Sequence, residues 1–242
     1  MNRLYIIDFI RGIAVILMTI FHIFLSLNLF SNTNYNLNNI LLNYSGIISR
    51  NLFIIISGIS IYLSYNNNKK EFNDKQIKRL STIFIFSLII TFLTYIVVPD
   101  KYVIFGILHY MFLSLLIILI IINLVDIKKY IYIIFIILFI FKNINYKNIN
   151  LEENSIVNYI KHIIGINPYY NLSIDYFPLN KWLWKTCLGV IIGLNIDIKK
   201  IQDKIPLEYN LDDNVITKIG KNSLFIYMLH LPILYFINKI FN

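Results

Sequence analysis

The first hydrophobic segment of the chain, residues 5–29, carries an acid, a base and a histidine in a run that is otherwise suited to a membrane. A helix advances about 100° per residue, so its polar residues fall on one side, within an arc of roughly 80°. This stripe consists of Asp8, Arg11, Val15, Met18, His22 and Ser26. The opposite face is Ile, Leu and Phe. Ionisable groups are costly in a bilayer and usually face a protein interior or a wet cavity. The segment is therefore predicted to be a spanning helix that lines a polar site.

The composition of the whole chain is typical of a membrane protein. It is 57% hydrophobic and 14% charged, with a mean hydropathy of +0.65. The net charge of +9 would also fit a nucleic-acid-binding protein, but Lys and Arg lie in short segments between apolar runs, which argues against nucleic acid as a partner. No linker divides the 242 residues, so we expect a single domain over 1–242.

The apolar segments predict an all-α fold, a polytopic membrane helix bundle of about seven transmembrane helices. A span needs about 20 mostly apolar residues. The segments that come near this length are 5–29, 45–65, 80–98, 102–125, 127–142, 180–198 and 219–241. The fifth is the weakest, because its uncharged run is only 130–141.

The basic residues between the segments predict the orientation. With the N-terminus inside, twelve Lys and Arg residues fall in cytoplasmic segments and six in outer segments. Because cytoplasmic loops are enriched in positive charge, we expect an integral cell-membrane protein with a cytoplasmic N-terminus and an outer C-terminus. Asp8 and Arg11 then lie near the cytoplasmic face, and His22 lies in the outer half.

Three histidines on three predicted helices, His22, His109 and His230, reach a similar depth. Gly220, Ser223 and Tyr227 are expected to share a helix face with His230. For any one histidine, a hydrogen bond to a backbone carbonyl in a packed core is an equally good interpretation. Three at one depth beside a charged helix favour a shared site. The spacing lacks the local pairs of common metal motifs, so we expect no metal.

Two other residues are expected to have no role in a functional site. The single cysteine, Cys187, excludes an internal disulfide and a multi-cysteine metal site, and is expected to pack in an apolar stretch. His162 lies in the long polar segment 143–179 and is expected to be solvated.

Five short motifs occur in order over nearly the whole chain. The first opens with Arg3, includes Asp8, Arg11 and Gly12, and is followed by Met18 and His22. The others are residues 52–60 (LFIIISGIS), 105–109 (FGILH), 175–179 (DYFPL, shortly before Trp182) and 220–232 (GKNSLFIYMLHLP). This ordered set resembles the transmembrane acyltransferase superfamily, and in particular small prokaryotic relatives of the heparan-alpha-glucosaminide N-acetyltransferase catalytic domain.

The resemblance implies an enzyme that moves an acetyl group from cytosolic acetyl-CoA, its acyl donor, to an amino or hydroxyl acceptor on the outer face, such as a cell-envelope glycan. His22 is the implied catalytic residue. A histidine can deprotonate the attacking group or carry the acyl group itself, and both routes stay open.

The remaining motif residues are expected to bind substrate or cofactor. Arg11, paired with Asp8, either meets a CoA phosphate or anchors the helix end. His109 and His230 are expected to bind or polarise the acyl carbonyl. The other expected contacts are Ser57, Asp175, Tyr176, Ser223 and Tyr227, of which Asp175 and Tyr176 would meet the acceptor.

Two alternatives share the same composition. A small-molecule or proton-coupled transporter could use the histidines as a relay, but no pair of Gly/Pro-broken helices indicates inverted repeats. A non-catalytic scaffold leaves the polar stripe unexplained. The expected partners are the lipid bilayer and acyl-CoA, and a homo-oligomer is compatible with the sequence.

Overall fold

The computed structural model describes residues 4–30, 35–36, 39–142, 155–166, 173–206 and 211–241. Within these ranges every regular element is a helix, and the one further pairing is an isolated parallel bridge between Phe105 and Tyr176. The predicted all-α class is confirmed for this part of the chain. The helices fall into two compact units, Met1–Ile56 with Ile196–Asn242, and Ser57–Asn195. Because one boundary lies inside helix α2, the single domain over 1–242 stays a prediction.

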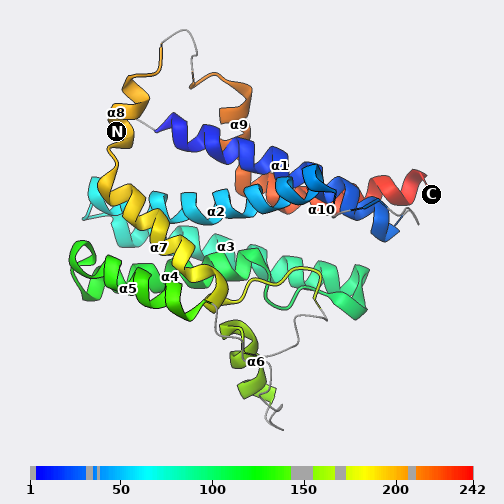
Figure 1. Ribbon diagram of the computed structural model, residues 1–242. Coiled ribbons are helices and arrows are strands. Elements are labelled where there is room, and N and C mark those ends of the chain that lie inside the picture. The colour runs from blue at the N-terminus through cyan, green and yellow to red at the C-terminus, as the bar shows by residue number, and fades with distance from the viewer. Residues whose placement is uncertain are drawn as a thin grey trace. The chain divides into compact units, whose positions relative to one another are not determined.

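The first unit contains α1 (Tyr5–Phe30), the beginning of α2 (Ile40–Asn67), α8 (Ile198–Asp203), α9 (Val215–Lys221) and α10 (Ser223–Phe241). Helices α9 and α10 both pack against α1. Helix α10 runs beside α1 in the same direction, so the two chain ends lie at opposite ends of this unit (Figure 1).

Helix α1 buries the face that its sequence predicts. Asp8, Met18 and Ser26 keep at most 4% of their exposure, whereas Ile20 and Ile23 on the other side keep at least 38%. The stripe therefore faces protein, and the aliphatic side is free to face lipid.

Two glycines bring the backbones of α1 and α9 together. A Cβ atom on Gly12 would overlap the carbonyl oxygen of Ile216, and one on Gly220 would overlap that of Asp8. Small residues allow helices in membranes to approach this closely. The contact fixes the height of α9 along α1.

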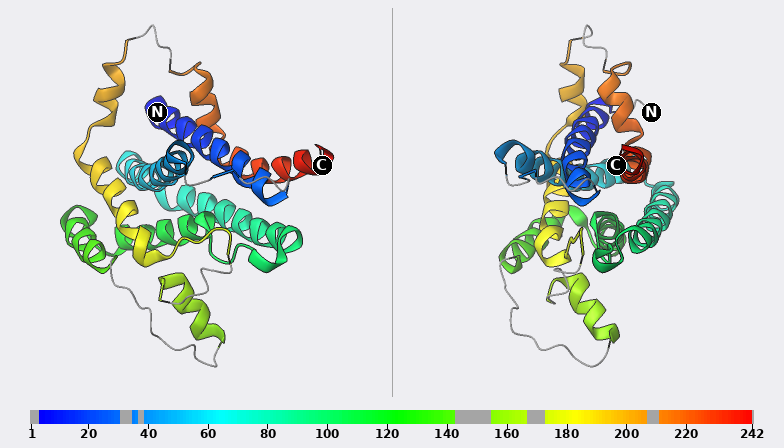
Figure 2. Two further views of the ribbon diagram at one scale, coloured as in Figure 1. Left: turned by 45° about the vertical axis from the view of Figure 1, so that its right-hand side comes forward. Right: turned by 90° about the vertical axis from the view of Figure 1, so that its right-hand side faces the viewer.

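The second unit contains the rest of α2 with η1 (Pro99–Lys101) and five further helices. These are α3 (Phe72–Val97), α4 (Ile107–Leu124), α5 (Ile127–Phe141), α6 (Ser155–Ile164) and α7 (Leu179–Asn195). Helix α3 packs on α4, and α7 packs on α4 and α5, as the views of Figure 2 also show. Helix α6 contacts α7.

The centre of this second unit is closely packed. The hydroxyls of Tyr110 and Thr186 lie 2.6 Å apart, and a Cβ atom on Gly58 would overlap the backbone of Thr186. Cys187 is fully buried, so its expected packing role is confirmed.

Four helices of the described ranges, α1 to α4, are long and apolar enough to cross a membrane. The chain is therefore an integral membrane protein, but the count of seven spans is not confirmed. Helix α5 has 15 residues and α7 has 17, about 22 and 26 Å at a helical rise, against a hydrocarbon core of about 30 Å. The apolar part of α10 runs only from Ser223 to Asn238.

The prediction of one helix over 219–241 is wrong. The chain leaves helical geometry at Asn222, with φ −104° and ψ 17°, which separates α9 from α10. Gly220 therefore belongs to α9 and packs on α1, and it does not share a face of α10 with Tyr227 and His230. A hydropathy pattern does not detect this turn, because apolar residues lie on both sides of it.

We expect Gly12→Ala to destabilise the protein because its new methyl group meets backbone, which cannot rotate away. Overpacking typically costs about 1–3 kcal/mol. Gly46→Ala is the matched control, since its methyl group would meet the ring of Phe21 at 3.1 Å, and a side chain can shift. Thermal unfolding in detergent should show a clearly lower midpoint for Gly12→Ala than for Gly46→Ala, and equal midpoints would contradict the close contact of α1 with α9.

Candidate functional site

Two of the three predicted histidines meet inside the first unit. Nε2 of His230 on α10 lies 3.3 Å from Nδ1 of His22 on α1, and the ring centres are 4.8 Å apart. The ring of Tyr227 lies 5.3 Å from that of His230. The structure thus brings His22, His230 and Tyr227 together across more than 200 residues of sequence.

The backbone carbonyls beside the pair fix which ring nitrogens carry protons. Nδ1 of His230 lies 2.6 Å from the carbonyl oxygen of Tyr227, and Nδ1 of His22 lies 3.0 Å from that of Met18. A carbonyl only accepts hydrogen bonds, so in the neutral rings both Nδ1 atoms are protonated. His22 then shares its N–H between Met18 and Nε2 of His230, and its own Nε2 carries a lone pair. Among the described residues, that Nε2 has no hydrogen-bond partner.

Further polar contacts hold α1 in place around the pair. Asn238 of α10 donates to Oγ of Ser26 at 3.1 Å, and Ser49 of α2 donates to the carbonyl of Ala14 at 2.9 Å. Ser223, a predicted contact, lies in the first turn of α10, two helical turns before His230. The stripe of α1 therefore packs on α10 at its histidine end.

The predicted pairing of Asp8 with Arg11 is confirmed. Oδ1 of Asp8 accepts a hydrogen bond from Nη1 of Arg11 at 2.9 Å, with the carboxylate side chain 4% exposed and the guanidinium side chain 24% exposed. Arg11 precedes His22 by eleven residues, about 16 Å along a helix. The ion pair and the histidine pair thus lie at two separate positions along the same face of α1. Arg3, which opens the first motif, lies outside the described residues.

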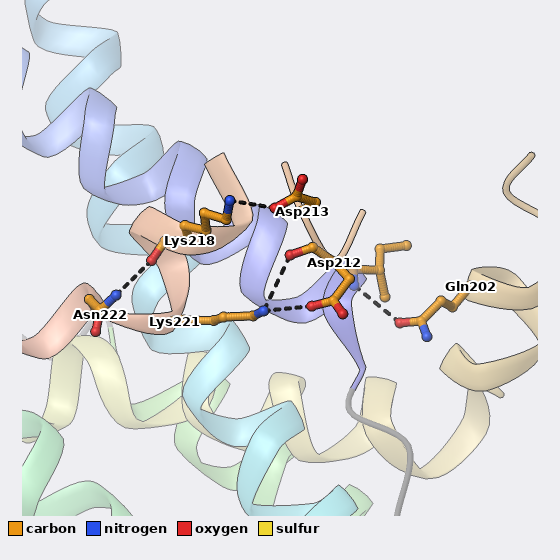
Figure 3. Close-up of polar contacts among 7 residues, drawn as sticks. Gln202, Asp212, Asp213, Lys218, Lys221 and Asn222 are labelled. Carbon is orange, nitrogen blue, oxygen red and sulfur yellow. Dashed lines mark hydrogen bonds and ion pairs between the residues drawn. The ribbon is translucent and has the colours of Figure 1, made fainter. Parts of the chain in front are cut away.

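Polar contacts also surround the start of α1 (Figure 3). Lys221 of α9 donates to Oδ1 of Asp212 at 2.7 Å and lies 4.9 Å from the centre of the Tyr5 ring. Lys218 pairs with Asp213. Exposed ion pairs contribute little stability, about 0–1 kcal/mol, and both of these join α9 to the residues just before it, so only the contact of Lys221 with Tyr5 reaches α1.

In the second unit, the 105–109 and 175–179 motifs lie side by side. Oδ2 of Asp175 accepts from the backbone N–H of Ile107 at 2.9 Å, and the N–H of Phe177 donates to the carbonyl of Phe105 at 3.0 Å. A Cβ atom on Gly106 would overlap the Asp175 carboxylate. Asp175 therefore caps the first turn of α4, and its contact with an acceptor stays a prediction.

The prediction that His162 is solvated is wrong. Its side chain is fully buried, and its ring stacks on that of Tyr176 with centres 4.4 Å apart. The Tyr176 hydroxyl donates to the carbonyl of His162 at 2.7 Å. Burial lowers the pKa of His162 to about 4 and raises the pKa of Tyr176 to about 12, so both are neutral at pH 7. Asn158, one helical turn before His162, is also buried. The spacing of four residues places both on one helix face, and this was the signal in the sequence that could have indicated the burial of His162.

His109 and Ser57 also lie in the second unit. Nε2 of His109 on α4 lies 3.1 Å from Oγ1 of Thr91 on α3. Ser57 on α2 is buried. Thr91 was missed by sequence reasoning, although a threonine in an apolar helix is a recognisable signal.

The family model for the heparan-alpha-glucosaminide N-acetyltransferase catalytic domain matches residues 3–232. The chain belongs to this family. Comparison with curated proteins and with solved structures gave no match. Membership in the N-acetyltransferase family makes the chain a membrane acyltransferase and confirms the resemblance seen in the motifs.

The N-acetyltransferase family match spans both units, and each unit by itself contains a histidine with a defined hydrogen-bond partner. No group of three or more His, Cys, Asp or Glu side chains that could hold a metal occurs in the ranges that the structure describes. What the first unit offers chemically is an imidazole pair in which both Nδ1 atoms face backbone carbonyls.

Because the folded protein holds His162 neutral, its stability should depend on pH. The folded pKa of about 4 lies below the ordinary 6.5, so the unfolded chain binds the extra proton between these values. The contribution is complete above pH 6.5 and is lost as the pH falls toward 4. Unfolding midpoints measured over this window should fall more steeply for the wild type than for His162→Phe, and parallel curves would contradict the burial of a neutral His162.

Proposed function

We propose that the protein is an integral membrane enzyme that moves an acetyl group from cytosolic acetyl-CoA to an amine or hydroxyl of a cell-envelope glycan on the outer face. The single observation that carries this proposal is the open lone pair on Nε2 of His22. The bond from Nδ1 to the Met18 carbonyl supports this tautomer, and family membership supports the acyl chemistry.

The reaction balances with His22 as a general base. As the acceptor nitrogen or oxygen forms its bond to the thioester carbonyl carbon, Nε2 of His22 takes the acceptor's proton. The carbon–sulfur bond then breaks, and the same proton passes from Nε2 to the departing sulfur. The products are the acetylated acceptor and free CoA thiol, and His22 returns to its starting state. Attack by Nε2 itself, through an acetyl-histidine, uses the same lone pair and remains the second route.

His230 acts through His22. When Nε2 of His22 takes a proton, its ring becomes positive, and the Nδ1–H bonds to Met18 and to Nε2 of His230 become charge-assisted. Because His230 gives its own N–H to the Tyr227 carbonyl, its Nε2 is held as an acceptor. His230 is therefore a positioning residue in this proposal.

The remaining finer assignments are part of the same proposal. Arg11, partly exposed beside Asp8, meets a CoA phosphate or keeps the entrance polar. Asp175 and Tyr176 lie at the acceptor side. Seven spans with an inside N-terminus and an outside C-terminus fit the parallel course of α1 and α10, which separates the two chain ends within the first unit.

His22→Ala should lower acetyl transfer from radiolabelled acetyl-CoA to amino sugars by roughly a hundredfold or more, the usual contribution of a positioned acid–base group. His230→Ala should lose less, roughly tenfold, because the Met18 carbonyl still holds the His22 ring. Thr19→Val is the matched control on α1, since the Thr19 hydroxyl donates to the carbonyl of Val15 in its own helix, and should keep near wild-type activity.

Full activity in His22→Ala would remove this residue from the mechanism. A wild-type protein that shows no dependence on acetyl-CoA would instead favour the transporter, which radiolabelled uptake into proteoliposomes would test.

Cysteines introduced at Asn68 and Lys101, on either side of α3, should react with a membrane-impermeant maleimide from opposite faces of oriented vesicles. Loops rich in Lys and Arg stay on the cytoplasmic side of a membrane. Asn68→Cys should therefore react from the inside and Lys101→Cys from the outside. The buried native Cys187 is expected to stay unlabelled. Labelling of both positions from one face would overturn the proposed topology.

A further inference from the structure

The second unit contains a histidine whose ring contacts a threonine hydroxyl. Oγ1 of Thr91 on α3 lies 2.9 Å from the carbonyl oxygen of Val103 and 3.1 Å from Nε2 of His109 on α4. It also lies 3.3 Å from the carbonyl of Ser87, one turn earlier in α3. A single hydroxyl group thus faces two carbonyls and one imidazole nitrogen.

The donor of each bond follows from the number of available protons. Thr91 has one hydroxyl proton, and a carbonyl can only accept, so the proton points to Val103, the nearer of the two carbonyls. Oγ1 then has only lone pairs left for His109. Nε2 of His109 must therefore be the donor, and in the neutral ring Nδ1 is the nitrogen with the lone pair.

This Nδ1 atom is buried, and none of the described residues gives it a hydrogen bond. A buried acceptor without a donor costs about 1–3 kcal/mol, and native proteins retain few of them outside functional sites. The apolar ring of Phe105 lies beside His109, with ring centres 5.9 Å apart. The atom is thus a fixed acceptor that lacks a donor.

We propose that Nδ1 of His109 accepts a hydrogen bond from a neutral N–H or O–H group of a substrate, and that Thr91 is the positioning residue that makes it an acceptor. The expected role of His109 in polarising an acyl carbonyl would need a donor at this atom, so the geometry replaces that role. The inference rests on the proposed function for the identity of the ligand. There, the pantetheine amides of CoA and the hydroxyl or amine of a sugar acceptor both supply such donors.

The tautomer and the ligand bond are measured directly by ¹⁵N NMR on histidine-labelled full-length protein in detergent, with His109→Phe used to assign the signals. Without ligand, Nδ1 should show the shift of an unprotonated nitrogen and Nε2 that of a protonated one. If saturating CoA moves the Nδ1 signal, the pantetheine arm is the hydrogen-bond donor. If saturating glucosamine moves it, the donor is a hydroxyl or amine of the sugar substrate. A protonated Nδ1, or a signal that neither compound moves, would overturn the proposal.

Two substitutions at His109 separate ligand binding from a structural link to Thr91. His109→Asn keeps a side-chain oxygen near the place of Nδ1, whereas His109→Gln reaches the place of Nε2 and can keep the bond to Thr91. We expect His109→Gln to raise KM roughly tenfold with kcat little changed, the loss of one hydrogen bond, and His109→Asn to raise it less. The reverse order would mean that His109 only ties α4 to α3.

Thr91 has its own matched set. Thr91→Val should lose the single tautomer in the NMR spectrum, and Thr91→Ser should restore it. Thr82→Val is the control, because Thr82 is an exposed residue of the same helix that bonds to the carbonyl of Lys78. A single Nε2-protonated tautomer in Thr91→Val would overturn the role of Thr91. These spectra do not depend on turnover, so an inactive wild type would count against the proposed function and leave the tautomer result standing.

Discussion

The contact of α1 with α9 is the constraint on which the first unit depends. Gly12 and Gly220 each place the backbone of one helix where a side chain of the other would otherwise lie. In a membrane, helix association relies on packing and hydrogen bonds, because lipid is as apolar as the helices themselves. The chain turns at Asn222 directly after this contact, so the position of α9 also decides where α10 begins. The height of His230 beside α1 follows from it.

The polar residues of α1 are paired because a bilayer offers them no water. Asp8 neutralises Arg11 within one helical turn, and Asn238 satisfies Ser26 from α10. The histidine pair is different, because one of its ring nitrogens has no such partner among the described residues. Three of the four ring nitrogens of His22 and His230 contact one another or backbone carbonyls, and the fourth is Nε2 of His22. In the proposed mechanism, that nitrogen serves as the base.

The second unit reaches a comparable result by a different route. Its two motifs are held together by the Asp175 cap on α4, which sets the start of the helix that carries His109. Thr91 then fixes the proton of His109 on Nε2, so that Nδ1 is the lone-pair nitrogen. His22 and His109 therefore offer lone pairs on opposite nitrogens of the ring. For His22 the atom is decided by a carbonyl, which can only accept, and for His109 by a hydroxyl whose one proton is already donated to Val103.

By itself, the sequence determined what depends on local geometry and on apolar length. The helical period placed the stripe of α1 on one face, and spacing of three residues paired Asp8 with Arg11. Only the tertiary structure decided the partner of His22, because that contact joins residues 208 apart. It also decided the burial of His162, which rests on Tyr176, and the break at Asn222, which hydropathy does not register. The tautomer of a histidine cannot be predicted from the sequence for the same reason. It depends on which acceptor atoms the fold brings within hydrogen-bond distance of each ring nitrogen.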